Sequence, residues 1–299
     1  MDWISGMQSA IDYIEEHLAG DINYEETAKR CCSSSYHFQR AFSILCGYTL
    51  GEYIRNRRLT LAGIELQAEK AKVIDAALKY GYDSPDSFAK AFKAFHGILP
   101  SQARSGGMLK SFSRMTIKVI MEGGFMNYRI EQKPEMILTG YKRRFSGDPA
   151  LRDKQEEEFF ITTRENQYIL KGLSKDVDTQ YTVISDLCDD GYNFYIASKL
   201  GKWSTENLDK ELGAESTKRF EKITIPSGQY LICETERMPY PTEVFLDLRR
   251  EAVSSWLPSS GYQLRNAPEV TVSHWYWDEN DPDVKNERYI ELWLPIEKK

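Results

Sequence analysis

The sequence predicts two domains: an all-α domain with two helix–turn–helix motifs, followed by an α+β domain built from a duplicated unit. A motif in the first hundred residues recurs at a constant offset of 50, and a fixed period indicates a repeated supersecondary unit. In the remainder, the expected order strand–strand–helix–strand–strand occurs twice, which is typical of an α+β domain. A length of 299 residues is sufficient for two domains.

The repeated motif reads Ser-x-x-x-Phe-x-Arg/Lys-Ala-Phe-x-x-x-x-Gly in both copies. It runs from Ser34 to Gly47 and again from Ser84 to Gly97. A serine before an apolar-periodic stretch is an N-cap signal and a glycine after it is a stop signal, so each copy contains a helix. A shorter helix is expected before each of them. The four helices, expected over residues 24–32, 35–46, 73–80 and 85–96, outline two helix–turn–helix motifs.

Helical spacing divides the second helix of each motif into two faces. The apolar faces carry Phe38, Ala41, Phe42 and Leu45, and Phe88, Ala91, Phe92 and Phe95. The opposite faces carry Tyr36, Gln39, Arg40 and Ser43, and Asp86, Ala89, Lys90 and Lys93. Arginine and glutamine on a helix in the major groove can reach base edges with paired hydrogen bonds. The alternative is that Arg40 and Lys90 only solvate an exposed face, but the repeated frame favours DNA recognition.

The stretch between the two motifs is suited to a connecting helix. One helix is expected over residues 50–67, and at about 1.5 Å per residue it would hold the motifs roughly 27 Å apart. Major grooves on one face of B-DNA repeat about every 34 Å, so one subunit could engage two of them. Residues 29–58 contain six basic side chains and a single acid, which predicts modest, salt-sensitive binding through a local patch.

Composition excludes several classes of protein. The chain has no apolar run long enough to cross a bilayer and no signal-like N-terminus, so a cytoplasmic protein without a membrane partner is expected. Five cysteines without a CxxC pair are expected to be reduced thiols, and four scattered histidines predict neither metal nor cofactor. The net charge of −6 falls on residues 113–299. Such an acidic, aromatic-rich region repels DNA and favours a cationic or apolar small molecule.

The motifs resemble the DNA-binding domain of the AraC/XylS family of transcription regulators. Residues 53–59, with the sequence Tyr-Ile-Arg-Asn-Arg-Arg-Leu, are similar to the linker-helix signature of that family, and the stretch from Gly81 to Arg104 is similar to its second-motif signature. The resemblance covers about residues 5–105. It implies a bacterial regulator that binds double-stranded promoter DNA, with RNA polymerase as a further expected partner.

The resemblance also implies which side chains meet DNA. In the family the first recognition helix is the strong base reader, and its positions fall here on Tyr36, Gln39 and Arg40. In the second helix, phosphate contacts by Lys90 and Lys93 are expected. The predicted DNA-binding residues are Tyr36, Gln39, Arg40, Ser43, Arg57, Asp86, Lys90 and Lys93.

Glycine pairs mark the domain boundary. Gly106-Gly107 ends the first region and Gly123-Gly124 precedes the second, and such stretches are typical of linkers. A DNA-binding domain is therefore expected over residues 1–108, a linker over 109–125 and an effector-binding domain over 126–299. Residues 115–121 alternate like a strand, which could begin the second domain or pack beside it.

The second domain is expected to form one curved antiparallel sheet with two helices on one face. Stretches rich in β-branched and aromatic residues predict its strands, and longer periodic stretches predict its helices. The expected strands cover residues 128–130, 136–145, 181–184, 192–198, 220–225, 229–234, 270–277 and 289–296, and the expected helices cover 154–170 and 241–257.

The last strand is the most informative part of this domain. Its aliphatic residues alternate onto one face, so Tyr289, Glu291 and Trp293 share the other. A carboxylate between two aromatic rings is costly to bury alone and is suited to a cation, which the rings also attract. The alternative is a surface strand with Glu291 in water. The predicted ligand-binding residues are Tyr192, Trp275, Trp277, Tyr289, Glu291 and Trp293.

This region resembles the GyrI-like effector-binding domain, which occurs alone and fused to transcription regulators. The resemblance spans roughly residues 125–299 and depends on residues 126–130, 225–230 and 289–296. In the family, the concave face of the sheet often holds a buried glutamate that meets lipophilic cations, and Glu291 is the matching candidate. Some GyrI-like proteins are hydrolases that use such a glutamate.

Three functions are compatible with these patterns. The first is a ligand-responsive transcription regulator of the multidrug-response type, whose C-terminal domain senses a small lipophilic or cationic effector. The second is a regulator whose C-terminal domain binds a protein partner. The third adds hydrolysis of the ligand with Glu291 as general base, although the sequence offers no Ser-His-Asp or Cys-His arrangement. We expect the first of these functions, and we therefore predict no catalytic residues and no enzyme activity.

Overall fold

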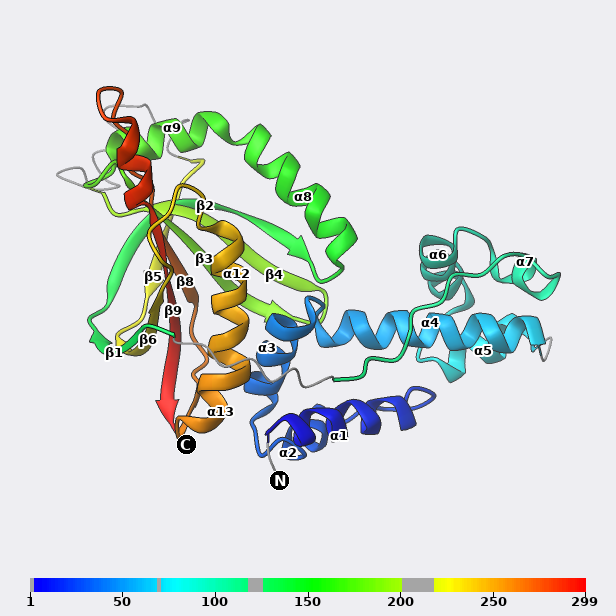
Figure 1. The fold of residues 1–299 in the computed structure, drawn as a ribbon. Coiled ribbons are helices and arrows are strands. Elements are labelled where there is room, and N and C mark those ends of the chain that lie inside the picture. Colours follow the sequence, from blue (N-terminus) through cyan, green and yellow to red (C-terminus); the bar gives the residue numbers. More distant parts are fainter. Residues whose placement is uncertain (1–2, 69–70, 118–125, 201–217) are drawn as a thin grey trace. The chain divides into compact units, whose positions relative to one another are not determined.

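The computed structural model describes residues 3–68, 71–117, 126–200 and 218–299 (Figure 1). The chain divides into two compact units, residues 1–39 with 48–121 and residues 40–47 with 122–299. The first is helical and the second is built on an antiparallel sheet. The predicted fold class, helix–turn–helix motifs followed by an α+β domain, is confirmed.

The helices of the two motifs, α2, α3, α5 and α6, lie in the regions where the sequence predicts them. In order, the helices before residue 118 are α1 Trp3–Glu16, α2 Tyr24–Lys29, α3 Ser35–Cys46, α4 Leu50–Ala68, α5 Val73–Lys79, α6 Pro85–His96 and α7 Pro100–Arg104. Ser84 caps α6 by accepting a hydrogen bond from the backbone N–H of Ser87 at 3.2 Å. Gly97 ends α6 with a φ of 80°, a conformation that glycine adopts without steric cost. The predicted bounds of α3 are confirmed, whereas α2 is shorter than expected.

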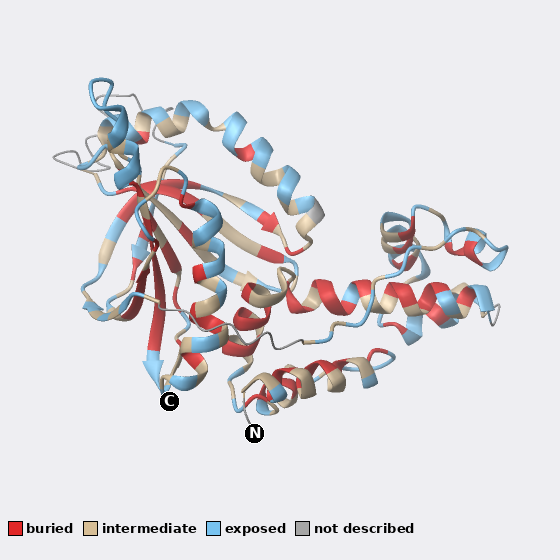
Figure 2. Cartoon of the chain, viewed as in Figure 1, coloured by how far each residue is buried: buried red, intermediate tan, exposed pale blue. Residues whose placement is uncertain are grey.

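The apolar stripes of the two motifs face the interior. Phe38, Phe42, Phe88 and Phe92 are all buried, whereas Leu45 at the end of the first stripe is half-buried. Figure 2 shows a run of buried positions along α4, which supplies the long apolar surface on which the second motif packs. Burial of these large side chains is the main source of stability for such a small helical unit.

A segment without regular secondary structure, residues 110–117, follows α7 and lies on the helices of the first unit; we call it the strap. The backbone N–H groups of Lys110, Phe112, Met115 and Ile117 donate to side chains of α1, α4 and α6 rather than to a neighbouring strand. The strand predicted over residues 115–121 is therefore wrong for 115–117, because side-chain acceptors satisfy that backbone. Residues 118–121 lie outside the described residues.

The second unit contains a nine-stranded antiparallel sheet in the described residues. Its strands are β1 Tyr128–Lys133, β2 Met136–Ser146, β3 Thr179–Cys188, β4 Gly191–Ser198, β5 Glu221–Ile225, β6 Gly228–Glu234, β7 Tyr262–Leu264, β8 Glu269–His274 and β9 Tyr289–Lys298. Eight of them follow the order β1-β6-β9-β8-β3-β4-β2-β5, and β7 pairs with β9. The strands β1, β2, β3 and β4 of the first half correspond to β5, β6, β8 and β9 of the second half. If each strand is replaced by its counterpart, the same order is obtained in reverse, so the two halves of the sheet are equivalent. The topology therefore bears out the predicted duplication.

The sheet curls because the chain ties its two ends together. Strand β5 is at one end of the strand order and β6 is next to the other end, yet only two residues, Pro226 and Ser227, connect them. Side chains from β2, β5, β6, β8 and β9 consequently pack into one apolar cluster on the inside of the curl. We call this side of the sheet the inner face.

Helices cover the opposite, outer face of the sheet (Figure 1). They are α8 Pro149–Thr162, α9 Arg164–Leu173, α12 Thr242–Glu251 and α13 Leu257–Ser259, with a π-helical turn at Ala252–Trp256 before α13. A 3₁₀ helix at Pro282–Glu287 lies in the connection between β8 and β9. Phe159 of α8 and Leu170 of α9 pack against Tyr141, Phe145 and Ile196 of the outer face. This confirms the expectation of helices on one face.

Several element boundaries in the second unit were predicted wrongly. The helix expected over residues 154–170 is broken at Thr163, because Thr162 and Thr163 donate to backbone carbonyls of the preceding turn and such bonds disturb a helix. The strand expected over 270–277 ends at His274. Strand β7 was not predicted, since only three residues form it.

Candidate DNA interface and effector site

The first recognition helix, α3, places three of its four predicted DNA-binding residues in half-buried positions. Tyr36, Gln39 and Ser43 are each neither fully exposed nor fully buried. The side-chain amide of Gln39 donates to Ser35 Oγ at 3.1 Å, one turn earlier on the helix. A single exchangeable hydrogen bond of this kind leaves Gln39 able to reorient toward a base edge.

Arg40 differs from its predicted role as an outward-facing base reader. Its exposed fraction is 5%, and Nη1 donates to the carbonyl of Ala267 at 2.7 Å. Nη2 lies 3.4 Å from Glu269 Oε2, within the second unit. Glu269 also accepts from Arg249, whose Nε lies 2.6 Å from Oε1. A buried carboxylate needs such partners, so contact between Arg40 and a base requires its guanidinium to leave Glu269.

The second recognition helix, α6, presents its predicted polar face to solvent. Asp86, Lys90 and Lys93 are all exposed. Two lysines on one exposed helical face can contact phosphates, whereas Asp86 at the start of the helix adds a negative charge that opposes phosphate binding. This helix is therefore better suited to backbone contact than to base reading.

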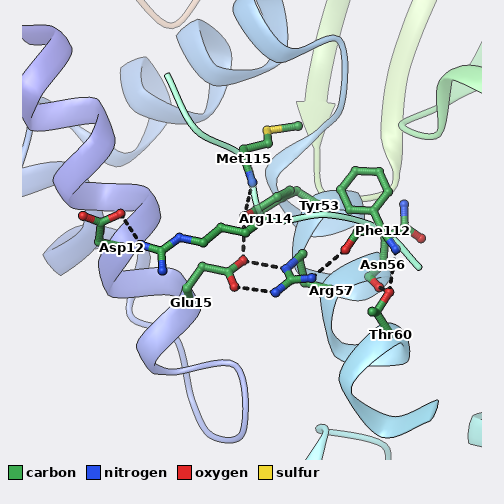
Figure 3. Close-up of polar contacts among 9 residues, drawn as sticks. All are labelled: Asp12, Glu15, Tyr53, Asn56, Arg57, Thr60, Phe112, Arg114 and Met115. Carbon is green, nitrogen blue, oxygen red and sulfur yellow. Dashed lines mark hydrogen bonds and ion pairs between the residues drawn. The ribbon is translucent and has the colours of Figure 1, made fainter. Parts of the chain in front are cut away.

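Arg57 also differs from prediction, because its guanidinium is used inside the first unit (Figure 3). Nε donates to Glu15 Oε1 and Nη2 donates to Glu15 Oε2, both at 2.8 Å, and Nη1 donates to the carbonyl of Phe112 at 2.5 Å. Burial alone would raise the pKa of Glu15, but the hydrogen bonds from Arg57 and Tyr53 hold it below its ordinary value. Arg57 thus makes internal contacts in this structure, and its contact with DNA stays a prediction that would require these bonds to break.

The inner face of the sheet carries the predicted carboxylate. Tyr289, Glu291 and Trp293 share this face as expected, and the register places Glu234 of β6 directly opposite Glu291. Glu291 is only 8% exposed. Its Oε2 accepts a 2.6 Å hydrogen bond from the indole Nε1 of Trp293, and its Oε1 accepts one from Arg129 Nη2 at 3.0 Å. The alternative of a surface strand with Glu291 in water is excluded.

Aromatic rings surround this carboxylate on neighbouring strands. Tyr181 of β3 and Tyr230 of β6 both approach Trp293 edge-on, with ring centroids 6.5 and 6.4 Å away. Tyr289 stacks on His274 of β8 at 4.2 Å. A hollow of about 400 Å³ lies beside Tyr289 and is lined also by Arg237, Tyr276, Val284 and Glu287. Buried charge next to stacked rings is an arrangement that suits organic cations.

Three predicted ligand residues lie away from this group. Tyr192 packs with Phe145 in the cluster on the outer face, because residues 192 and 195 on β4 point to opposite sides of the strand. Trp275 and Trp277 follow the end of β8 and are exposed. The ring of Trp275 stacks against the guanidinium of Arg288 at 4.5 Å. The structure therefore does not bring these three residues to Glu291.

Comparisons with known proteins match two separate regions of the chain. Residues 27–106 match the model of a helix–turn–helix domain, and residues 129–296 match that of the integron-associated effector binding protein. The HTH-type transcriptional activator AarP of Providencia stuartii is 46% identical over 92 residues, which are 31% of this chain and 68% of AarP. The regulatory protein SoxS of Salmonella typhimurium is 37% identical over 98 residues, which are 33% of this chain and 92% of SoxS.

The chain is an AraC-type transcription regulator with a GyrI-like effector-binding domain. Among solved structures, the integron cassette protein Cass2 of Vibrio cholerae covers 58% of this chain and 98% of its own, with 16% identity and a TM-score of 0.37. The helix–turn–helix match includes both α3 and α6. Within the described ranges of this AraC-type regulator, no helix is long and apolar enough to span a membrane.

Sequence reasoning missed the residues that accompany Glu291 in this regulator. Arg129 binds Glu291, Glu131 and Glu234 together, and the Lys133 ammonium lies 4.4 Å from the centroid of the Trp293 ring. The signal was available, since Arg129, Glu131 and Lys133 alternate along one short strand. His274 was also missed. Burial lowers its pKa, and its Nε2 has no hydrogen-bond partner among the described residues.

Proposed function

We propose that this AraC-type regulator contacts promoter DNA through α3 and α6 and senses a lipophilic cation on the inner face of its sheet. The observation that carries the effector proposal is the group of three carboxylates, Glu131, Glu234 and Glu291, next to the Trp293 ring. A cation with an aromatic body fits this chemistry, because its charge pairs with the acids and its rings pack on the aromatic side chains.

Selectivity for cations follows from the cost of burying Glu291. A neutral molecule of the same shape that displaced Arg129 would leave Glu291 with the Trp293 indole as a partner but without a positive charge to replace the lost ion pair. Apolar contact would then supply most of the affinity, and the charge pair would supply the discrimination. We expect a dissociation constant in the micromolar range, on the order of −7 to −8 kcal/mol.

The hydrolase alternative is less well supported by the same geometry. A general base needs a carboxylate oxygen that can accept a proton from water. One oxygen of Glu291 accepts from Arg129 and the other from the Trp293 indole, so both oxygens already have donors other than a water molecule. The nearest additional titratable group on β8, His274, offers an acid only after it gains a proton that burial disfavours.

The effector proposal can be tested with ions that differ only in charge. Tetraphenylphosphonium and tetraphenylborate have nearly the same shape, and their binding to the full chain can be followed by calorimetry and by quenching of tryptophan fluorescence. We expect the phosphonium to bind and the borate to fail. Glu291→Gln should weaken phosphonium binding by at least about 1 kcal/mol, whereas Glu243→Gln, an exposed acid on α12, should leave it unchanged. Equal binding of both ions would reject a charge-selective site.

The DNA proposal separates base reading from phosphate contact. Gln39→Ala should cost about 1–3 kcal/mol and relax the preference at one or two base positions. Lys93→Ala should weaken binding to all sequences alike and reduce the salt dependence by about one ion. Binding-site selection followed by salt titrations distinguishes the two.

AarP is named a transcriptional activator, so we also propose RNA polymerase as a partner of this regulator. Effector-dependent transcription in a purified system would test this proposal.

A further inference from the structure

One cation already lies on the inner face of the sheet, and it belongs to the chain itself. Nε, Nη1 and Nη2 of Arg129 donate respectively to Glu131, Glu234 and Glu291. All three nitrogens of the guanidinium are therefore committed to carboxylates. Burial opposes the charge of Arg129, but its bonds to Glu131 and Glu291 raise its pKa above the ordinary value. The guanidinium consequently stays charged across the accessible pH range.

The local charge shows what this arrangement does to the site. Glu131, Glu234 and Glu291 contribute three negative charges, against which Arg129 and Lys133 contribute two positive ones. The ammonium of Lys133 also lies over the Trp293 ring at 4.4 Å, on the surface that a ligand ring would use. Both attractions that the site offers to a cation, carboxylate and ring face, are thus occupied by side chains of β1.

We propose that Arg129 is an intramolecular competitor whose guanidinium holds the position taken by the positive group of a bound effector. This inference rests on the proposed function, because it concerns the same site. A ligand that binds must displace Arg129 from Glu291 and Glu234. Arg129 therefore sets how tightly a cation must bind before the sensor responds, and it is a specificity-determining residue of the site.

The position of Arg129 allows such displacement. Its side chain is 39% exposed, whereas that of Glu291 is 11% exposed. Arg129 lies on β1, the first strand in the sheet order, which pairs on one side only among the residues that the structure describes. The guanidinium can turn outward to solvent while Glu131, on the same strand, remains a partner. A buried carboxylate with a movable counter-ion can exchange one cation for another without becoming unpaired.

Competition makes a prediction opposite to that for an ordinary contact residue. Removing a residue that holds a ligand weakens binding, whereas removing a competitor strengthens it. The apparent dissociation constant is the intrinsic one divided by the fraction of molecules in which the site is free. If the Arg129 guanidinium occupies the site about nine tenths of the time, Arg129→Ala should bind tetraphenylphosphonium about tenfold more tightly.

The experiment measures binding of tetraphenylphosphonium and tetraphenylborate to the full chain and to three variants. Arg129→Ala removes both the positive charge and the planar group of hydrogen-bond donors. Arg129→Lys keeps the charge but cannot span three carboxylates. Arg143→Ala is the matched control, because Arg143 is also on the sheet and pairs with Glu158 of α8 on the outer face. Circular dichroism at the binding temperature verifies that each variant is folded.

We expect Arg129→Ala to gain about tenfold in affinity for the phosphonium and Arg129→Lys to gain less, with Arg143→Ala within about twofold of the wild type. Combining Arg129→Ala with Glu291→Gln should abolish most of the gain. Equal gains in Arg129→Ala and Arg143→Ala would attribute the effect to overall charge and overturn the proposal. If the wild type binds the phosphonium and Arg129→Ala binds it with equal or lower affinity, the competitor role is overturned and the proposed cation sensing is not. Failure of every variant to bind the phosphonium overturns both.

Discussion

Each unit contains an arginine bound to carboxylates, and the two clusters differ in how closed they are. Around Arg57, the guanidinium and its partner Glu15 have side-chain exposures of 12% and 8%, and the strap covers them through Phe112 and Met115 (Figure 3). Around Arg129, the guanidinium is 39% exposed and bridges three acids on the inner face. We call the residues around Arg57 the closed cluster and those around Arg129 the open cluster.

The difference indicates that the setting of an ion pair determines its role. Each nitrogen of the Arg57 guanidinium has an acceptor, and the Tyr53 hydroxyl donates to Glu15 at 2.6 Å and accepts from the Met115 N–H at 3.2 Å. Such a cluster resists change, because breaking one bond leaves a buried charge unpaired. The open cluster can exchange partners with water or a ligand at small cost. Stability measurements should separate the two.

The largest expected effect is on the closed cluster. Glu15→Ala should lower the free energy of unfolding of the first unit by about 3–5 kcal/mol, because Arg57 keeps its burial but loses its counter-ion. Urea denaturation followed by circular dichroism measures the change. Glu16→Ala is the control, since the neighbouring acid is exposed on the same helix. Similar losses for the two variants would mean that the cluster is not specifically stabilising.

A second prediction tests whether the strap is part of the closed cluster. Thr60 Oγ1 accepts from the Phe112 N–H at 2.9 Å and donates to the carbonyl of Asn56. Thr60→Val preserves the shape but leaves the Phe112 N–H without its acceptor, which should cost about 1–3 kcal/mol. Hydrogen exchange should show lost protection at the Phe112 amide and unchanged protection at Phe92 in α6. Retained protection at Phe112 would show that the strap is held by other contacts.

The third prediction concerns pH and the start of the strap. Burial lowers the pKa of His96. Its Nδ1 accepts from the Lys110 N–H at 3.2 Å, and its Nε2 lies 3.0 Å from the Leu59 carbonyl, so the neutral ring with a proton on Nε2 satisfies both. Because the folded pKa lies below the unfolded value of about 6.5, the unfolded state takes up the proton first as pH falls. The unfolding free energy should therefore fall below about pH 6.5, with a slope of at most about 1.4 kcal/mol per pH unit.

Replacing the imidazole provides the comparison for this pH effect. His96→Gln should be less stable than the wild type at pH 7.5, and the difference between the two proteins should shrink as the pH falls toward 5.5. The reason is that only the wild type loses stability by protonation at this position. Chemical denaturation across this range measures the difference. A constant difference would show that protonation of His96 does not contribute.

Periodicity and capping predicted much of the fold, because those signals are local. Ser84 and Gly97 delimit α6 as expected, and alternation in β9 correctly grouped Glu291 with Trp293. Roles that depend on distant partners were beyond a local pattern. Arg57 is a residue type that commonly contacts DNA. Its internal ion pair is with Glu15, which is 42 residues away in sequence and therefore outside any local pattern. Arg129 likewise gains its role from Glu291, which is 162 residues away.

The smallest expected effect is on the open cluster. Arg129→Ala should change the free energy of unfolding of the second unit by less than about 1 kcal/mol, because an exposed guanidinium is screened by water and its attraction is partly offset by side-chain entropy. Glu291 keeps its bond to the Trp293 indole, so removing the arginine does not leave it without a partner. Tryptophan fluorescence during denaturation reports this unit, since five of the six tryptophans follow residue 200. A loss as large as that of Glu15→Ala would contradict the comparison, because it would make Arg129 as structural as Arg57. A small loss would mean that the chain keeps Arg129 on the inner face for a reason other than stability.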